Sequence, residues 1–159
     1  MKIQILDKTK KKKFIEGISY LGVEKIPLLL MATGTERVRA FSGSLSNEEI
    51  MAFWRLFPIE GVGLYFGKDF VDKRNGKREV RLSLDALHIL KEQIKSGVVV
   101  LDKEQENEWF LGKDVDGGFD EKGFVAVSDG KDFIGTGKVT EDGKRLMNFL
   151  PKERRRRES

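Results

Sequence analysis

Two glycine-containing motifs carry residue types that bind phosphate or calcium in other proteins. GTGKV (135–139) places glycine beside lysine, as a phosphate-binding loop does. That loop also needs glycine where Asp132 stands and a helix after the lysine, whereas a strand pattern follows here. DVDGGFDEKG (114–123) begins like a calcium loop, but Phe119 and Val125 occupy the positions of its essential glycine and glutamate. We therefore predict no cofactor and no metal site.

Few side chains remain that could carry catalysis. The chain has no cysteine and one histidine, His88, which excludes disulfides, thiolate nucleophiles and sites that need two imidazoles. Glu48 and Glu49 are adjacent, but they follow Ser46 in the pattern of a capping box at a helix start. We therefore predict that the chain is not an enzyme, and a small enzyme that uses carboxylates alone is the remaining catalytic alternative.

The C-terminal sequence LPKERRRRES (150–159) concentrates basic side chains. Five of the six residues 152–157 are basic, and these cations repel one another and cannot join a core. One interpretation is a disordered, solvated tail. The other is an arm that lies along RNA phosphates, because Lys and Arg gain affinity by releasing counterions from a nucleic acid.

The composition is that of a folded, soluble protein with an uneven charge distribution. Of 159 residues, 39% are hydrophobic and 35% are charged, and the net charge is +4. Residues 102–132 carry a net charge of −6 and residues 152–158 carry +3, so one surface can face a polyanion while another stays acidic. Without a membrane-spanning run or a secretory signal, we expect a cytoplasmic location. Abundant Lys and Glu with few amides are typical of thermophilic proteins.

The N-terminal sequence predicts a small α/β module. KIQIL (2–6) is typical of an edge strand, and PLLLMATG (27–34) and RVRAFSG (37–43) indicate two further strands. Between them we expect a helix that starts near Lys13, because the lysines at 10–13 would oppose the helix dipole if it started earlier. The alternative is an earlier start, with lysines that have a function of their own.

A second helix and a hairpin follow in the sequence. Ser46 and Glu49 predict the start of the helix, and Pro58 predicts its end. The segment VGLYFGKDFVDKRNGKREVRLSL (62–84) predicts a hairpin closed at Asn75-Gly76 by a two-residue type I′ turn, which matches the twist of paired strands.

The C-terminal half predicts one helix followed by strands and turns. The helix is expected over about 83–95, and GVVVLD (97–102) indicates a fully buried strand. EWFLGK (108–113) is interpreted as another strand. Asp-Gly pairs at 129–130 and 142–143 predict an antiparallel meander at the end of the chain.

Several of these segments together resemble the PUA module, an RNA-binding fold of pseudouridine synthases and archaeosine transglycosylases. They are GLYFGK, REVRLSLDALHIL, VVVLDKEQENEWFLGKDV, GFVAVSDGKDFIGTGKV and NFLPKERR, within about residues 60–156. The closest likeness is to the PUA modules attached to Sun-type RNA cytosine-5 methyltransferases. The chain has neither the length for their S-adenosylmethionine-binding domain nor their catalytic cysteines, so the resemblance implies RNA binding without the chemistry.

The resemblance also implies a fold and a set of contact residues. The fold class is α+β, with a small α/β module at 1–75 that resembles pre-PUA modules and a PUA-like mixed β pseudo-barrel at 76–159. RNA in that family lies along the helix, a neighbouring strand and the closing strand. The matching positions of this sequence are Arg81, Lys91, Lys95, Lys138, Lys152, Arg154 and Arg155. Lys68 is predicted to add a phosphate contact, and Gly135 and Gly137 to let the backbone approach a ribose or phosphate.

Two functions follow as expectations. The first is a non-catalytic RNA-binding protein for structured tRNA or rRNA, in RNA modification or ribosome biogenesis. The second is a scaffold that docks to an RNA methyltransferase or an assembly factor, for which the acidic stretch 102–132 would suit a basic partner.

Overall fold

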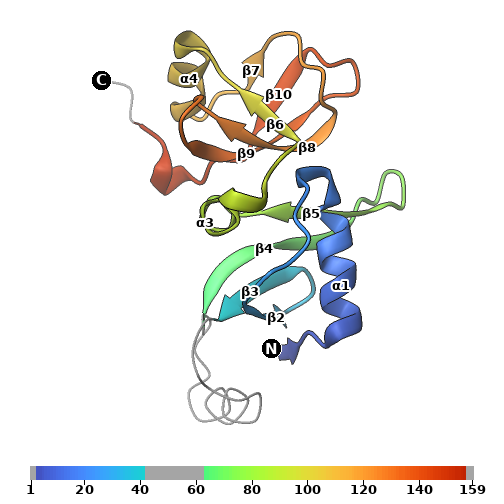
Figure 1. The fold of residues 1–159 in the computed structure, drawn as a ribbon. Coiled ribbons are helices and arrows are strands. Elements are labelled where there is room, and N and C mark those ends of the chain that lie inside the picture. Colours follow the sequence, from blue (N-terminus) through green and yellow to red (C-terminus); the bar gives the residue numbers. More distant parts are fainter. Residues whose placement is uncertain (1–2, 42–62, 157–159) are drawn as a thin grey trace. The chain divides into compact units, whose positions relative to one another are not determined.

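The computed structural model describes residues 3–41 and 63–156 of the chain (Figure 1). The chain divides into two compact units, Met1–Ile18 with Lys25–Leu82 and Ser19–Glu24 with Ser83–Ser159. The division falls between Leu82 and Ser83, whereas the predicted domain boundary between 75 and 76 falls in the loop of a hairpin. The helix predicted from Ser46 to Pro58 lies outside the described residues.

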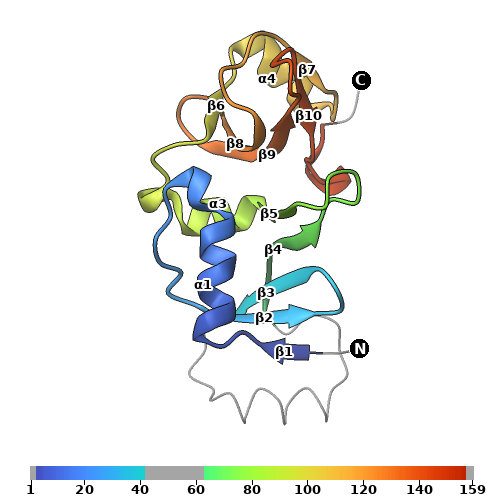
Figure 2. The same ribbon diagram turned by 90° about the vertical axis from the view of Figure 1, so that its right-hand side faces the viewer.

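The N-terminal unit is an antiparallel sheet with one long helix against it (Figures 1 and 2). The strand order is β1-β2-β3-β4-β5, so the predicted edge strand at the N-terminus is confirmed. The elements are β1 (Ile3–Ile5), α1 (Lys8–Gly17), β2 (Leu29–Thr33), β3 (Arg37–Phe41), β4 (Leu64–Val71) and β5 (Arg78–Leu82). Together with the second sheet described below, this unit gives the predicted α+β fold.

Helix α1 begins earlier than expected. Its first residue is Lys8, and the carboxylate of Asp7 accepts a hydrogen bond from the backbone N–H of Lys10 at 2.9 Å. The predicted start near Lys13 is therefore wrong. An Asp cap contributes about 1 kcal/mol, which offsets part of the cost of lysines at a helix N-terminus. The opposite side of the helix buries Phe14, whose ring centroid lies 6.3 Å from that of Phe66 in β4.

The β4–β5 hairpin is confirmed, but its turn is not the predicted type I′ turn. Val71 pairs with Arg78, so a longer loop than two residues connects the strands. A type I′ turn needs positive φ at both central residues, and here Gly76 has φ 69° while Asn75 does not have positive φ. The side chain of Asn75 instead accepts a hydrogen bond from the N–H of Lys77 at 2.8 Å.

The C-terminal unit is a mixed sheet in the order β6-β8-β9-β10-β7 (Figures 1 and 2). Strands β6 and β8 are parallel, and the other pairs are antiparallel. The strands are β6 (Val98–Val100), β7 (Val115–Asp116), β8 (Gly123–Ser128), β9 (Phe133–Val139) and β10 (Arg145–Asn148). The helical elements are η1 (Ser19–Leu21), α3 (Leu84–Ile89), η2 (Lys91–Gln93), α4 (Lys103–Phe110) and η3 (Lys152–Arg154).

Two of the predicted strands in this unit are wrong in part or in full. The first half of the segment expected as a strand at 108–113 lies in α4, because Asp102 and Gln105 form a reciprocal capping box that starts a helix. The strand at 97–102 exists as β6, but it is not fully buried, since Val100 is 61% exposed. The Asp-Gly hairpins are confirmed between β8 and β9 and between β9 and β10.

Trp109 of α4 lies at the centre of the C-terminal core. Its side chain is fully buried, and its indole N–H donates a hydrogen bond to the carbonyl of Ile134 at 3.0 Å. A Cβ on Gly135 would lie 2.7 Å from Cζ2 of Trp109, and one on Gly137 would lie 2.7 Å from Cδ1 of Leu146. These glycines therefore provide the space into which the indole packs.

Replacing Gly135 with alanine should destabilise the protein in the absence of any RNA. The added methyl group would overlap the buried indole, and overpacking of this kind costs about 1–3 kcal/mol. Thermal unfolding should therefore occur at a lower temperature for Gly135→Ala. Gly118→Ala is the matched control, because nothing lies within 4 Å of a Cβ at that position. Equal unfolding temperatures for the two variants would contradict the packing role of Gly135.

Candidate nucleic-acid interface

Helix α3 and strand β9, against which it packs, organise the cations of the C-terminal unit. Ser83 caps the helix by accepting a hydrogen bond from the N–H of Ala86 at 3.1 Å. Ala86 and Leu87 are buried, and the helix packs against β9. His88 is exposed at the end of the helix. The buried side thus fixes the helix and leaves its polar side chains at the surface.

A small cleft of about 290 Å³ lies where α3 meets the β8–β9 turn. His88, Lys91 and Glu92 line one side, and Lys131, Asp132 and Phe133 line the other together with Ser128. Lys91 was predicted as a contact residue, whereas Lys131 was missed. The signal for Lys131 was present, since it stands in the Asp-Gly turn that connects the two longest strands of the motif.

The β8–β9 turn beside this cleft is held by its own backbone. The carboxylate of Asp129 accepts hydrogen bonds from the N–H groups of Asp132 and Lys131 at 2.8 and 2.9 Å. These bonds favour the ionised form and hold the pKa of Asp129 below its usual value. Lys131 therefore extends from a turn of defined shape.

Lys138 lies on β9, on the sheet face opposite to the one that Gly135 and Gly137 present to the indole, because side chains alternate along a strand. Its Nζ is 4.9 Å from the ring centroid of Phe124 on the paired strand β8. The Phe124 ring in turn lies 5.8 Å from that of Phe149, just after β10. The ammonium group of the half-buried Lys138 is thus positioned over the buried ring of Phe124.

The basic C-terminal segment contacts the rest of the unit at each residue from Arg154 to Arg156. The guanidinium of Arg154 pairs with the carboxylate of Asp85 in α3 at 3.1 Å. Arg155 donates from Nε to the carbonyl of Leu150 at 2.9 Å, and the N–H of Arg156 donates to the carbonyl of Phe110 at 2.6 Å. The interpretation as a detached tail is therefore wrong for residues 152–156. Arg157 to Ser159 lie outside the described residues.

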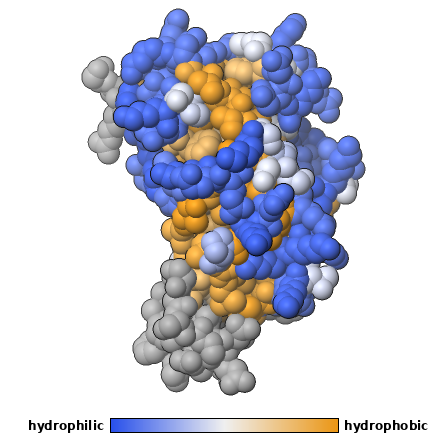
Figure 3. Space-filling model, in the orientation of Figure 1, coloured by the Kyte–Doolittle hydropathy of each residue, from blue (hydrophilic) through white to orange (hydrophobic). Residues whose placement is uncertain are grey.

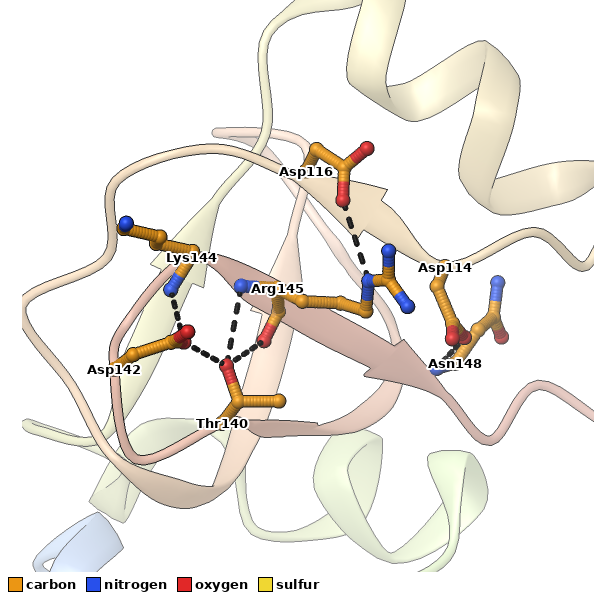
Figure 4. A network of polar contacts seen from close by, with 7 residues as sticks. All are labelled: Asp114, Asp116, Thr140, Asp142, Lys144, Arg145 and Asn148. Carbon is orange, nitrogen blue, oxygen red and sulfur yellow. Dashed lines mark hydrogen bonds and ion pairs between the residues drawn. The ribbon is translucent and has the colours of Figure 1, made fainter.

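A polar network fixes the strand that leads into this segment (Figure 4). Asp114 accepts a hydrogen bond from the N–H of Asn148 at 2.9 Å, and Asp116 pairs with Arg145 at 3.3 Å. Asp142 accepts from the hydroxyl of Thr140 at 2.7 Å, which lowers the pKa of Asp142. The side-chain amide of Asn148 also donates to the carbonyls of Trp109 and Lys113. The network joins β10 to the residues around α4 and so fixes where η3 begins.

The predicted contact residues are thus distributed over both units. Lys91, Lys95, Lys138, Lys152, Arg154 and Arg155 belong to the C-terminal unit, together with Gly135 and Gly137, whereas Lys68 and Arg81 belong to the N-terminal unit. Lys68 forms an ion pair with Glu36 at 3.0 Å, and Arg81 is half-buried in β5. Lys91, Lys95 and Lys152 are exposed. Contact of each of these residues with RNA stays a prediction.

The surface around these cations is mainly hydrophilic. Figure 3 shows blue, hydrophilic residues over much of the visible face, with orange hydrophobic surface exposed between them. Ile89, beside His88 on α3, is 44% exposed. Among the described residues, no group of three or more His, Cys, Asp or Glu side chains is arranged to hold a metal ion. No helix in the described part of the chain is long and apolar enough to cross a membrane.

Comparison with protein families finds a similarity for most of this unit. Residues 96–156 match the family model described as the methyltransferase RsmF PUA domain. This segment is similar to a PUA module. The match runs from just before β6 to the residues after η3, so it includes Lys138 and the basic C-terminal segment. Helix α3 and Lys91 precede the matched PUA module, although α3 packs on its strand β9. No match to the chain was found among curated proteins.

Proposed function

We propose that this chain is a non-catalytic RNA-binding protein that recognises structured tRNA or rRNA in RNA modification or ribosome biogenesis. The observation that carries the proposal is the set of cations around α3 and β9 in the unit that contains the PUA module. Arg154 lies beside the start of α3, and Lys91 follows its end. A six-residue helix spans about 9 Å, so the two positions bracket a short stretch of surface.

The chemistry of these groups suits a phosphate backbone. Lysine ammonium groups release counterions when they neutralise phosphates, and the guanidinium fork of arginine matches phosphate oxygens. The ion pair of Arg154 with Asp85 joins side chains that are 45% and 43% exposed. Exposed pairs contribute little, about 0–1 kcal/mol, so a phosphate can replace Asp85 at small cost.

The form of the surface favours recognition of RNA shape over sequence. The cleft beside α3 is lined by two lysines, a histidine and two acidic residues, Glu92 and Asp132, and it is small, at about 290 Å³. Phe133 borders this cleft, while Phe124 lies beneath Lys138. Phosphate contacts fix the position of a protein on RNA, and sequence readout requires unstacked bases on exposed aromatic rings. We therefore expect structured RNAs to bind with little preference for sequence.

A second candidate function is a scaffold that docks a basic protein, because α4 presents acidic side chains. Glu104 and Glu108 are exposed on this helix, and Asp102 precedes them. Such a surface would attract a positively charged partner, for example an RNA methyltransferase or an assembly factor. Both functions can reside in one chain, since α4 and the cations near α3 are different elements.

Affinity purification of the tagged chain from cell extract, with and without ribonuclease, separates the two functions. We expect tRNA or rRNA to be recovered with the intact protein, and most co-purifying proteins to be lost after nuclease treatment. The physical reason is that RNA would bridge the chain to those proteins. Protein partners that survive the nuclease, with no RNA recovered before it, would favour the scaffold and contradict the proposed RNA-binding function.

A further inference from the structure

The N-terminal unit contains a basic cleft that is separate from the PUA module. Its volume is about 660 Å³, and residues of α1, β3, β4 and the β4–β5 hairpin form its walls. Five cations line it: Lys10, Lys13, Arg37, Lys73 and Arg78. This volume lies within the range of about 300–1,000 Å³ that is usual for ligand clefts.

Each of the two carboxylates that line the cleft is paired with a cation, Asp69 with Arg78 of the lining and Glu36 with Lys68 outside it. Asp69 accepts a hydrogen bond from Nε of Arg78 at 2.8 Å, and Glu36 forms an ion pair with Lys68 at 3.0 Å. Within residues 3–41 and 63–156, no carboxylate forms an ion pair with Lys10 or Lys13. The excess positive charge of the cleft therefore comes chiefly from α1.

The lysines of α1 are placed where they cost stability. The helix begins with the sequence KTKKKK and has no acidic residue in its first turn. Each exposed cation there opposes the helix dipole by about 0.3–1 kcal/mol. Lys11 has a structural role, because its Nζ donates to the carbonyl of Leu28 at 2.7 Å. No described contact gives Lys10 or Lys13 such a role, and an anion bound in the cleft would convert their unfavourable charge into a favourable one.

The walls of the cleft are held in place before any ligand binds. Nη1 of Arg78 donates to the carbonyl of Lys13 at 3.1 Å, which joins β5 to α1. Leu6, Val38 and Phe70 add apolar surface to the lining. A site that combines fixed cations with apolar surface suits a nucleotide chain, in which phosphates alternate with bases.

We propose that this cleft binds a single-stranded segment of RNA, with Lys10, Lys13 and Lys73 on its phosphates. The inference rests on the proposed RNA-binding function and extends it, because it gives the chain a second RNA contact outside the PUA module. Two contacts on one chain raise the affinity for one RNA through effective concentration.

The test compares charge-reversed lysine pairs on the same helix. Lys10→Glu with Lys13→Glu removes two cations from the cleft, while Lys8→Glu with Lys12→Glu makes the same charge change at exposed positions that do not line it. Both are made in the full chain and checked for folding by circular dichroism. The probe is a short fluorescent single-stranded RNA, and its anisotropy is measured over a range of salt concentrations. A third variant, Lys91→Glu with Lys131→Glu, reports on the C-terminal unit.

We expect the cleft pair to weaken binding by about tenfold or more and to reduce the salt slope by about 0.7 for each lysine. The control pair should change the affinity less than about threefold, because it alters only the net charge of the molecule. Equal losses of RNA affinity for the two pairs would overturn the proposal that RNA binds in the cleft. Loss only in the Lys91/Lys131 variant would also overturn it but leave the RNA-binding function intact, whereas no binding by the unaltered chain would remove both. Full competition by a mononucleotide would identify a small nucleotide as the ligand and overturn the RNA assignment.

Discussion

Trp109→Ala is expected to destabilise the C-terminal unit by about 3–5 kcal/mol, the usual cost of removing a large buried aromatic side chain. Its indole is fully buried, and it contacts Gly135, Gly137 and the carbonyl of Ile134. The substitution would leave a cavity and an unpaired carbonyl in the centre of the core. Urea unfolding followed by circular dichroism measures the change.

Trp109→Phe is the matched control for this prediction. Phenylalanine keeps most of the apolar volume but cannot donate to the carbonyl of Ile134. We expect it to cost about 1–3 kcal/mol, which corresponds to an unsatisfied buried acceptor and a smaller cavity. Costs below about 1 kcal/mol for both variants would contradict the central position of the indole in the core.

Reversing the charges of Lys91 and Lys131 is expected to weaken RNA binding by about tenfold to a hundredfold at low salt, because two phosphate contacts would become repulsive. The two lysines approach the same cleft from η2, which follows α3, and from the β8–β9 turn. Both side chains are exposed, so their replacement should leave the fold intact. The measurement is the dissociation constant for a labelled tRNA, determined with the full chain.

The matched control for this charge reversal is Lys103→Glu with Lys122→Glu. These lysines are exposed in the same unit and carry the same charge change, but neither lines the cleft beside α3. We expect the control to weaken binding only slightly, through the net charge of the molecule. If control and cleft variants lost affinity equally, the phosphate contacts could not be assigned to α3 and β9.

Local signals in the sequence predicted the two Asp-Gly turns and the start of α3, but not the type of the β4–β5 turn or the start of α1. Gly130 and Gly143 have positive φ in the two Asp-Gly hairpins, a conformation that glycine adopts at little cost. Ser83 was predicted as the start of α3 and caps it. The strand expected at 108–113 was wrong because a short apolar run such as Trp109-Phe110-Leu111 is compatible with both a helix and a strand. The signal that distinguishes the two is the capping pair of Asp102 with Gln105, which starts a helix.

Long-range contacts were beyond sequence reasoning. The glycines at 135 and 137 were predicted to admit RNA, but the indole of Trp109 occupies the space beside them. Arg154 and Asp85 are 69 positions apart, and nothing local in the sequence indicates that they pair. Lys131 stands in a turn that the sequence predicted, but its proximity to Lys91 arises only after α3 has packed on β9.

The salt dependence of RNA binding by the full chain tests the central claim most directly. Four phosphate contacts in the C-terminal unit, at Lys91, Lys131, Lys138 and Arg154, predict binding of tRNA or rRNA fragments at low salt. They give a logarithmic slope of about −3 between about 50 and 200 mM salt, and the cleft of the N-terminal unit would make the slope steeper. A slope near zero, or no association with any of these RNAs at the lowest salt concentration, would contradict the account.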